Sequence, residues 1–182
     1  MNIDIIQRQL VENYIGGKFT ELQEQWWEEY LSDSLIVHLK GPRGSGRTLF
    51  GVGLLASESF LYSNRYSVIC TDNQDSRRFR MNQAKEFIEQ SVSSLSKFVN
   101  CLFEYPFKNV ASSEILLDNC SVITCLVRDY RNFRGRTLSG LFIDETGIKA
   151  IEDINEEFWA AVMPMMLVNH DNKSKIIISM DE

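Results

Sequence analysis

The sequence lacks the cysteine and histidine spacings from which zinc sites are built. Its four cysteines include no C-x-x-C pair, and its two histidines, His38 and His170, lie far from them along the chain. A zinc site needs several such ligands at close spacing, so we predict none. Reduced and mostly buried thiols in an intracellular protein are the expectation.

Long apolar runs are also missing. No stretch approaches the roughly 18 residues that a membrane-spanning helix needs. The N-terminal segment "MNIDIIQRQLVENYIGG" has no basic region followed by an apolar core, so it does not have the pattern of a secretory signal. We expect a protein that neither enters a membrane nor is secreted, with a helix or an arm at residues 1–17.

An excess of basic residues is absent as well. The chain has 19 lysines and arginines against 25 acidic residues, for a net charge of -6. Tight binding to the phosphate backbone of nucleic acids depends on clustered lysine and arginine. Any contact with DNA is therefore expected to be local, or to arise only on assembly.

The length of 182 residues and the hydrophobic content of 44% predict a single domain over residues 1–182. Repeats and low-complexity runs are absent. We divide the chain into an N-terminal helical segment, residues 1–33, and a core, residues 34–182.

Apolar strand patterns and helical periodicities alternate along the chain. They predict helices over residues 19–33, 47–63, 76–103 and 154–166, strands over 34–40, 65–71, 138–145 and 174–180, and a hairpin over 113–127. The hairpin turns at Asp118 and Asn119, which tolerate the left-handed conformation. Pro164 is expected to kink or end the last helix after Met163. The alternation predicts an α/β domain with a mainly parallel sheet, whose ligands lie at the carboxyl ends of the strands.

A glycine-rich loop, "GPRGSGRT", lies between the first predicted strand of the core and the next helix. Its spacing predicts a phosphate-binding loop whose backbone N–H groups hold a phosphate and whose Thr48 hydroxyl binds Mg²⁺. The predicted nucleotide-binding residues are Gly41, Arg43, Gly44, Ser45, Gly46, Arg47 and Thr48. Arg47 stands where the pattern asks for lysine, and Arg43 is a second basic residue inside the loop. An ordinary glycine turn with surface arginines is the alternative interpretation.

A pair of acidic residues ends the predicted strand "GLFIDE". Asp144 lies 96 residues after Thr48. One carboxylate at such a strand end orients a metal and its waters, and the next takes a proton from attacking water. We predict these roles for Asp144 and Glu145, with two solvated acids as the alternative.

Four arginines, Arg128, Arg131, Arg134 and Arg136, fall within nine positions just before that strand. A solvated loop is one interpretation of this density. An arginine directed at a phosphate is the other.

Together these segments resemble a known family. "GPRGSGRT", "YSVICTDNQDSRRFRMNQAKEFIEQ", "EILLDNCSVITCLV", "FRGRTLSGLFIDE" and "KIIISM" are similar to the ATPase domain of the large terminase subunit, the DNA-packaging motor of tailed phages and herpesviruses. The resemblance implies a P-loop NTPase fold, a three-layer α/β sandwich with a mainly parallel central sheet of the ASCE, terminase-like type. It also implies ATP and Mg²⁺ as cofactors.

The resemblance assigns further roles. Asp144 assists the metal, Glu145 activates water, and Ser179 matches the motif that couples hydrolysis to movement. Arg134 matches a finger that reaches into a neighbouring subunit's site, with Arg136 as the competing candidate. A glutamine upstream of the loop contacts adenine in the family, for which Gln25 is the candidate and Gln23 the alternative.

The family also implies partners and a place of action. We expect a homo-oligomeric ring on a portal, with double-stranded DNA, a small terminase subunit, and a nuclease-bearing domain or subunit, because no nuclease pattern occurs in these 182 residues. The expected compartment is the host cytoplasm for a phage, or the nucleus for a herpesvirus-like virus. A helicase-like ATPase, and a nucleotide-binding module that Arg47 has deprived of turnover, are the rival functions.

Overall fold

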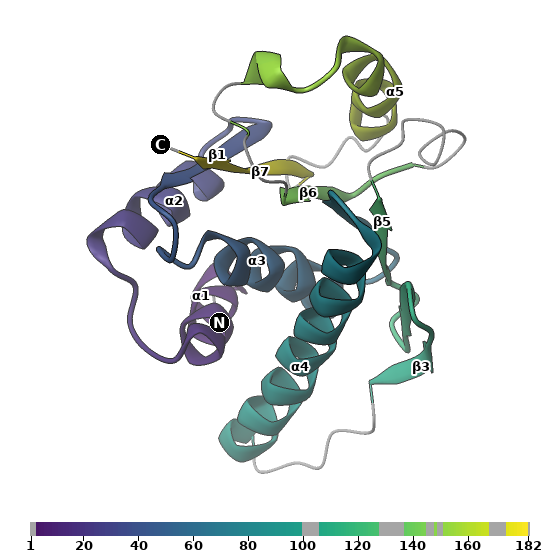
Figure 1. The fold of residues 1–182 in the computed structure, drawn as a ribbon. Helices are drawn as coiled ribbons and strands as arrows, with labels where there is room; N and C mark the ends of the chain where they lie inside the picture. The colour runs from purple at the N-terminus through teal and green to yellow at the C-terminus, as the bar shows by residue number, and fades with distance from the viewer. Residues whose placement is uncertain are drawn as a thin grey trace.

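The structure is a computed structural model that describes residues 3–99, 106–127, 137–144, 148, 151–167 and 174–181. Figure 1 shows its elements in chain order. The helices are α1 (Ile3–Ile15), α2 (Glu21–Leu31), α3 (Arg47–Leu61), α4 (Gln74–Val99) and α5 (Glu156–Leu167), with a 3-10 turn η2 (Ile151–Asp153). The strands are β1 (Ile36–Gly41), β2 (Tyr66–Thr71), β3 (Phe107–Val110), β4 (Glu114–Leu117), β5 (Val122–Val127), β6 (Gly140–Asp144) and β7 (Lys175–Asp181).

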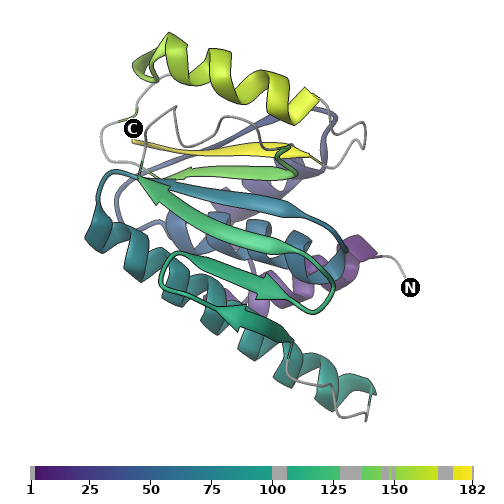
Figure 2. The ribbon, with the colours of Figure 1, turned by 90° about the vertical axis from the view of Figure 1, so that its right-hand side faces the viewer.

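The seven strands form one sheet in the order β1-β7-β6-β2-β5-β4-β3. The first five of that order pair in parallel, and β4 and β3 add an antiparallel edge. The edge is visible beside β5 in Figure 2. The predicted mainly parallel sheet is confirmed, and so is the hairpin, since β4 and β5 pair antiparallel across residues 118–121.

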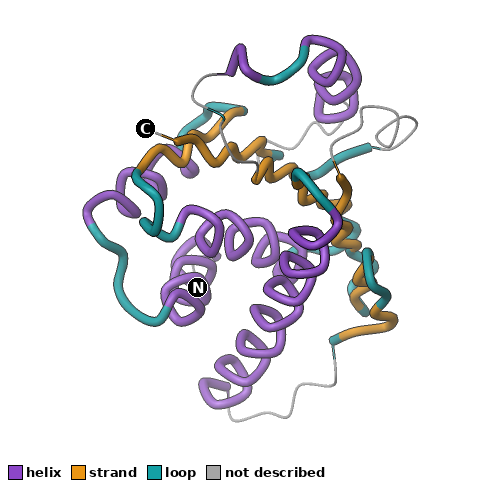
Figure 3. Tube along the Cα trace, in the orientation of Figure 1, coloured by secondary structure: helices purple, strands orange, loops and turns teal. Residues whose placement is uncertain are grey.

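Helices cover both faces of the sheet, which gives the three layers expected of the fold (Figure 3). Alternate residues of one strand point to opposite faces. On β2, Ile69 packs with the cluster that holds α3 and α4, whereas Val68 and Cys70 pack with the α5 residues Phe158 and Val162. Because both faces are buried there, the central strands β2, β6 and β7 are buried without alternation, whereas β1 at the edge of the sheet alternates.

Two details of the sequence interpretation change, and a third is tested only in part. Strand β3 was not predicted, because "FKNV" buries only Phe107 and its other three residues are exposed, which leaves no apolar pattern to detect. Helix α5 runs through Pro164 to Leu167, so Pro164 does not end the helix after Met163. Burial of its apolar face against the sheet outweighs the one hydrogen bond that proline removes. A kink at Pro164, the other expected outcome, stays a prediction. The predicted helix over 76–103 is α4 as far as Val99, and residues 100–105 lie outside the described ones.

The N-terminal segment forms two helices that pack on the core. Val11 of α1 is fully buried, and the Tyr14 ring meets Phe87 of α4 edge-on at 5.1 Å between centroids. No helix within the described ranges is long and apolar enough to cross a membrane.

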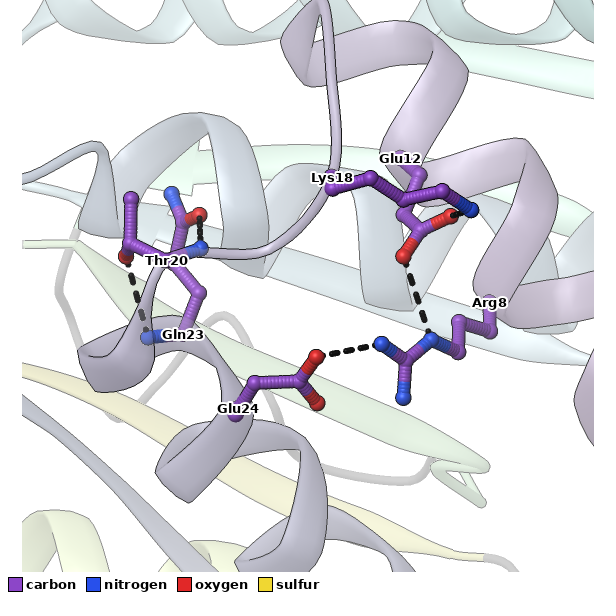
Figure 4. Close-up of polar contacts among 6 residues, drawn as sticks. All are labelled: Arg8, Glu12, Lys18, Thr20, Gln23 and Glu24. Carbon is purple, nitrogen blue, oxygen red and sulfur yellow. Dashed lines mark hydrogen bonds and ion pairs between the residues drawn. The ribbon is translucent and has the colours of Figure 1, made fainter.

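Helix α2 lies against the strand that leads into the glycine loop. Its Trp26 and Trp27 are buried, and the Trp26 indole N–H donates a hydrogen bond of 3.1 Å to the carbonyl of Lys40. Thr20 and Gln23 close a capping box at its N-terminus, shown in Figure 4. A Cβ added at Gly41 would stand 2.9 Å from Leu22 Cδ2. Helix α2 therefore supports the point where β1 ends and the loop begins.

Candidate functional site

The carboxyl ends of the central parallel strands meet at one edge of the sheet. The strand register places Gly41 of β1 beside Asp181 of β7, and Thr71 of β2 beside Asp144 of β6. A cleft of about 550 Å³ opens at this edge. It is lined by Arg43, Gly44, Gly46, Arg47, Thr48, Leu49, Asp72, Ser76, Arg80, Asp144, Ser179 and Asp181. Seven of these twelve are predicted site residues, so strand order brings together positions that lie up to 136 residues apart, from Arg43 to Ser179.

The glycine loop has the backbone geometry of an anion cradle. Gly44 and Gly46 have φ angles of 84° and 88°, in the left-handed region that residues with a Cβ rarely adopt. Gly46 is the N-cap of α3 and has no side chain to cap the helix, so the first N–H groups of α3 remain for a ligand. The Ser45 hydroxyl is buried and has no hydrogen-bond partner in the described structure. Loop and helix together present donors and a positive helix end to the cleft.

Thr48 and Asp144 are in direct contact across the cleft. The Thr48 hydroxyl donates a hydrogen bond of 2.9 Å to Asp144 Oδ1, and the Asp144 side chain is only 8% exposed. A hydroxyl and a carboxylate side by side are hard oxygen donors, the type that Mg²⁺ prefers. No group of three or more His, Cys, Asp and Glu that could hold a metal occurs among the described residues. Such a pair suits a metal that keeps waters and takes its other ligands from a bound phosphate.

The Arg47 side chain contacts strand β7. Its Nη2 lies 2.6 Å from Asp181 Oδ1, and its Nη1 donates to the carbonyl of Met180. Arg43 is exposed on the loop. Ser179, the predicted coupling residue, is buried one residue before Met180 and reaches the cleft lining. Hydrogen bonds therefore join Arg47 of the loop to strand β7.

Sequence reasoning missed Arg80, which also contacts Asp144. Its Nε donates to Asp144 Oδ2, and its Nη1 donates a hydrogen bond of 3.1 Å to Gln83 Oε1. The signal that could have found it is the spacing of Ser76 and Arg80. Residues four apart share one face of a helix, and both line the cleft.

The two glutamines proposed for adenine differ in position. Gln25 is exposed on α2. Gln23 is buried, its Oε1 accepts from the Thr20 backbone N–H at 3.0 Å (Figure 4), and its Nε2 would stand 3.2 Å from a Cβ at Gly46. Gln23 is therefore the glutamine beside the loop.

Several predicted residues lie outside the described ones. These are Glu145, Arg134, Arg136, Arg128 and Arg131. Their roles stay predictions.

The strand, glycine loop and helix, with a strand-end aspartate opposite, define the class as a P-loop α/β fold. No model of a known protein family matches the sequence, and no curated protein matches it. Similarity is found with solved structures. The chain superposes on the HK97 bacteriophage large terminase with a TM-score of 0.67 and 14% identity, over 99% of this chain and 38% of that one.

Two other phages provide similar structures. The ATPase domain of the Thermus phage P74-26 large terminase has a TM-score of 0.63 and 18% identity, over 93% of this chain and 68% of that one. The large terminase of a thermophilic bacteriophage, in complex with ATP-gamma-S, has a TM-score of 0.51 and 12% identity, over 96% of this chain and 37% of that one. The chain thus has the fold of a large terminase ATPase domain, and it spans 38% of the length of the HK97 protein.

Proposed function

We propose that the chain is a Mg²⁺-dependent ATPase that powers the movement of viral double-stranded DNA into a capsid. The observation that carries the proposal is the contact between Thr48 and Asp144, at 2.9 Å beside a left-handed glycine loop, within a large terminase ATPase fold. The ATP-gamma-S complex of the thermophilic phage terminase supports a nucleotide as the ligand of this cleft.

The loop holds the phosphates in this proposal. Backbone N–H groups from Gly44 to Thr48 and the N-terminus of α3 donate to phosphate oxygens. Thr48 and Asp144 hold Mg²⁺, which neutralises charge on the transferred phosphoryl group when bound. Asp144 is nearly buried, so its carboxylate is oriented before the ligand arrives.

Glu145 follows Asp144 directly and is the proposed general base. It takes a proton from the water that attacks the terminal phosphorus, and the bond to the bridging oxygen breaks to give ADP and phosphate. Arg134, or Arg136 in its place, would stabilise the same phosphoryl group in a neighbouring subunit. Gln25 or Gln23 would contact the adenine.

Arg47 or Arg43 takes the role of the missing lysine. A guanidinium pairs with two phosphate oxygens but is bulkier than an ammonium and cannot follow a moving phosphoryl group as a point charge does. Arg47 must also leave Asp181 and the Met180 carbonyl to reach a phosphate. We therefore expect slow turnover in the isolated chain.

The proposed assembly is a homo-oligomeric ring on a portal, acting in the host cytoplasm or nucleus. Its partners are double-stranded DNA, a small terminase subunit and a nuclease-bearing domain or subunit. Ser179 would transmit hydrolysis to movement, since it lies on the strand that Arg47 contacts.

A nucleotide-binding module with little turnover is the second candidate. The ion pair between Arg47 and Asp181, at 2.6 Å, favours it, because a basic residue held there does not assist hydrolysis. Steady-state phosphate release decides between the candidates when measured on the chain alone, with DNA, and with DNA and portal. Stimulation by DNA and portal supports the motor. Nucleotide binding without phosphate release under all three conditions supports the module.

A further inference from the structure

Arg80 holds the carboxylate group that the proposed metal site uses. Asp144 Oδ1 accepts from Thr48, and Asp144 Oδ2 accepts from Arg80 Nε. The Arg80 side chain is 18% exposed and that of Asp144 is 8% exposed. Each oxygen of the carboxylate therefore already has one strong partner, and the second partner is a cation.

The fold aims Arg80 into the cleft. The chain leaves β2 at Thr71, next to Asp144, and enters α4 through Asn73, whose side chain accepts from the N–H groups of Asp75 and Ser76 at 3.1 and 2.9 Å. Arg80 follows Ser76 by one helical turn on the same face. Gln83, in the next turn, holds Nη1 of the guanidinium at 3.1 Å.

The guanidinium has donors to spare. Among the described residues Arg80 Nε serves Asp144 and Nη1 serves Gln83, and no partner is seen for Nη2. Arginine has five N–H donors in a planar fork that matches phosphate oxygens. Arg80 can therefore donate from Nη2 to a phosphate oxygen while its backbone stays in place.

A divalent cation at Asp144 changes the balance of the ion pair. Two cations on one nearly buried carboxylate repel each other, and the repulsion is large where little water screens it. A phosphate between them removes it, because a phosphate oxygen accepts from Arg80 while Mg²⁺ binds the carboxylate. Asp144 and Arg80 thus form an element with two arrangements whose balance a ligand shifts.

We propose that Arg80 is a phosphate ligand that acts within its own subunit: it holds Asp144 when the cleft has no Mg²⁺-nucleotide, and it contacts the terminal phosphate of a nucleoside triphosphate when Mg²⁺ binds Asp144. This inference rests on the proposed function and adds a residue to it. A contact with the terminal phosphate would make the cleft selective for triphosphate over diphosphate, because a diphosphate lacks that phosphate.

Calorimetric titration tests the inference. The wild-type chain, Arg80→Gln, Arg80→Lys and Arg78→Gln are titrated with ADP and with a non-hydrolysable ATP analogue, each in Mg²⁺ and in EDTA. Arg78 is the matched control, because its substitution removes the same charge from the same helix, but it is exposed and lies with Met81, Asn82 and Lys85 in another groove.

We expect Arg80→Gln to weaken binding of the ATP analogue in Mg²⁺ by about tenfold to a hundredfold, the worth of one hydrogen bond to a charged group. ADP affinity should stay the same or rise, because Asp144 is released for the metal. The loss should disappear in EDTA, where Arg80 stays on Asp144 in the wild type. Arg78→Gln should match the wild type in every titration.

The outcomes separate the two proposals. If the wild-type chain binds neither nucleotide, the proposed function is overturned, and this inference with it. If the wild-type chain binds nucleotide but Arg80→Gln has the same ratio of ATP-analogue to ADP affinity, the inference alone is overturned. An equal loss of affinity for both nucleotides in Arg80→Gln has the same consequence. If circular dichroism shows that Arg80→Gln is unfolded, Arg80→Lys carries the test: a smaller Mg²⁺-dependent loss for the ATP analogue supports the inference, and wild-type affinity for it overturns the inference.

Discussion

The two ends of the parallel sheet both gather charged residues from distant parts of the chain, yet they do different things. At the carboxyl end, Arg47 pairs with Asp181 and Arg80 with Asp144 around an open cleft. At the amino end, Tyr30 donates to buried Glu58 at 2.6 Å, and Gln7 donates to Tyr30 and Ser57 at 2.7 and 2.9 Å.

The amino end is a network of matched donors and acceptors. Burial raises the pKa of Tyr30 well above its ordinary value, which keeps the phenol protonated as the donor to Glu58. Lys175 donates to the backbone carbonyls of Ser32 and Ser34 at 2.5 and 2.6 Å, and burial lowers its pKa. These contacts tie α1, α2, α3 and β7 together.

The difference between the two ends indicates which charges serve the fold and which we propose bind a ligand. At the amino end, the donors of Gln7, Tyr30 and Lys175 meet acceptors in the surrounding elements, two of them backbone carbonyls. At the carboxyl end, Arg47 and Arg80 each form an ion pair with an aspartate beside the backbone donors of the glycine loop. Substitutions at the amino end should lower stability, and substitutions at the carboxyl end should change ligand binding and turnover.

The largest expected effect concerns Arg134. If it stabilises the phosphoryl group in a neighbouring subunit, Arg134→Ala should lose about 10³- to 10⁵-fold in rate. Mixing Arg134→Ala with Glu145→Gln should restore part of the hydrolysis, because one subunit brings the finger and the other an intact site. Phosphate release measures this, and Arg136→Ala is tested in the same way. Absence of recovery, with assembly confirmed by sedimentation, would assign Arg134 to its own site or to the fold.

Glu145→Gln should lower turnover by about 10²- to 10⁴-fold and leave ATP binding intact, because glutamine keeps the shape but accepts no proton. Asp144→Ala should also weaken metal-dependent binding. Phosphate release and fluorescent ATP-analogue titration measure the two properties. Retained turnover in Glu145→Gln would remove that residue from the chemistry.

Removal of a loop arginine should weaken nucleotide binding by about tenfold to a hundredfold if that arginine replaces the lysine. Titration of a fluorescent ATP analogue into Arg43→Ala and Arg47→Ala identifies which one it is. Arg47→Ala also removes the contacts with Asp181 and the Met180 carbonyl on β7, which Arg43→Ala leaves in place. Undiminished affinity in both variants would mean that neither arginine touches phosphate.

Tyr30→Phe tests whether the amino end of the sheet affects stability alone and not nucleotide binding. It leaves Glu58 and Gln7 without the phenol oxygen at 2.6 and 2.7 Å, so we expect a loss of about 1–3 kcal/mol in the free energy of unfolding. Nucleotide affinity should not change. Thr48→Ala is the counterpart, with weakened Mg²⁺-nucleotide binding and little change in stability. Urea unfolding measures the stability of both variants, and calorimetry measures their nucleotide affinity. A loss of affinity in Tyr30→Phe would contradict the assignment of separate roles to the two ends.

The smallest effect is a pH dependence at Glu12, which Figure 4 shows between Arg8 and Lys18. Burial raises its pKa, but hydrogen bonds from Lys18 at 2.7 Å and Arg8 at 3.2 Å outweigh burial, so the pKa is lowered from 4.5. The stabilisation is therefore complete above pH 4.5 and is lost as the pH falls through the folded-state pKa. Glu12→Gln should cost about 1 kcal/mol or less at pH 7, and its difference from wild type should shrink in acid. Urea unfolding from neutral to acid pH measures this, and a constant difference would contradict it.

The elements that the sequence predicted well are those whose signal is local. Strands β2, β6 and β7 are largely buried apolar runs, and β1 keeps Val37 and Leu39 buried. The glycine spacing marks the loop in which Gly44 and Gly46 adopt the left-handed conformation. Edge strand β3 was not predicted, because a mostly exposed strand needs no apolar pattern. Arg80 was missed because its spacing from Ser76 indicates a shared helix face but not the carboxylate that this face meets.

Local patterns alone predicted the alternation of strands and helices, the glycine loop, and the acidic residue at the end of β6, since periodicity and backbone preference are properties of neighbouring residues. The position of β7 between β1 and β6 became visible only in the folded chain. That order sets Asp181 beside Gly41 and within reach of Arg47, and the pairing of β6 with β2 sets Asp144 where α4 delivers Arg80. The physical reason is that strand order depends on which buried faces pack together, and contacts across 64 and 134 residues leave no trace in any local pattern.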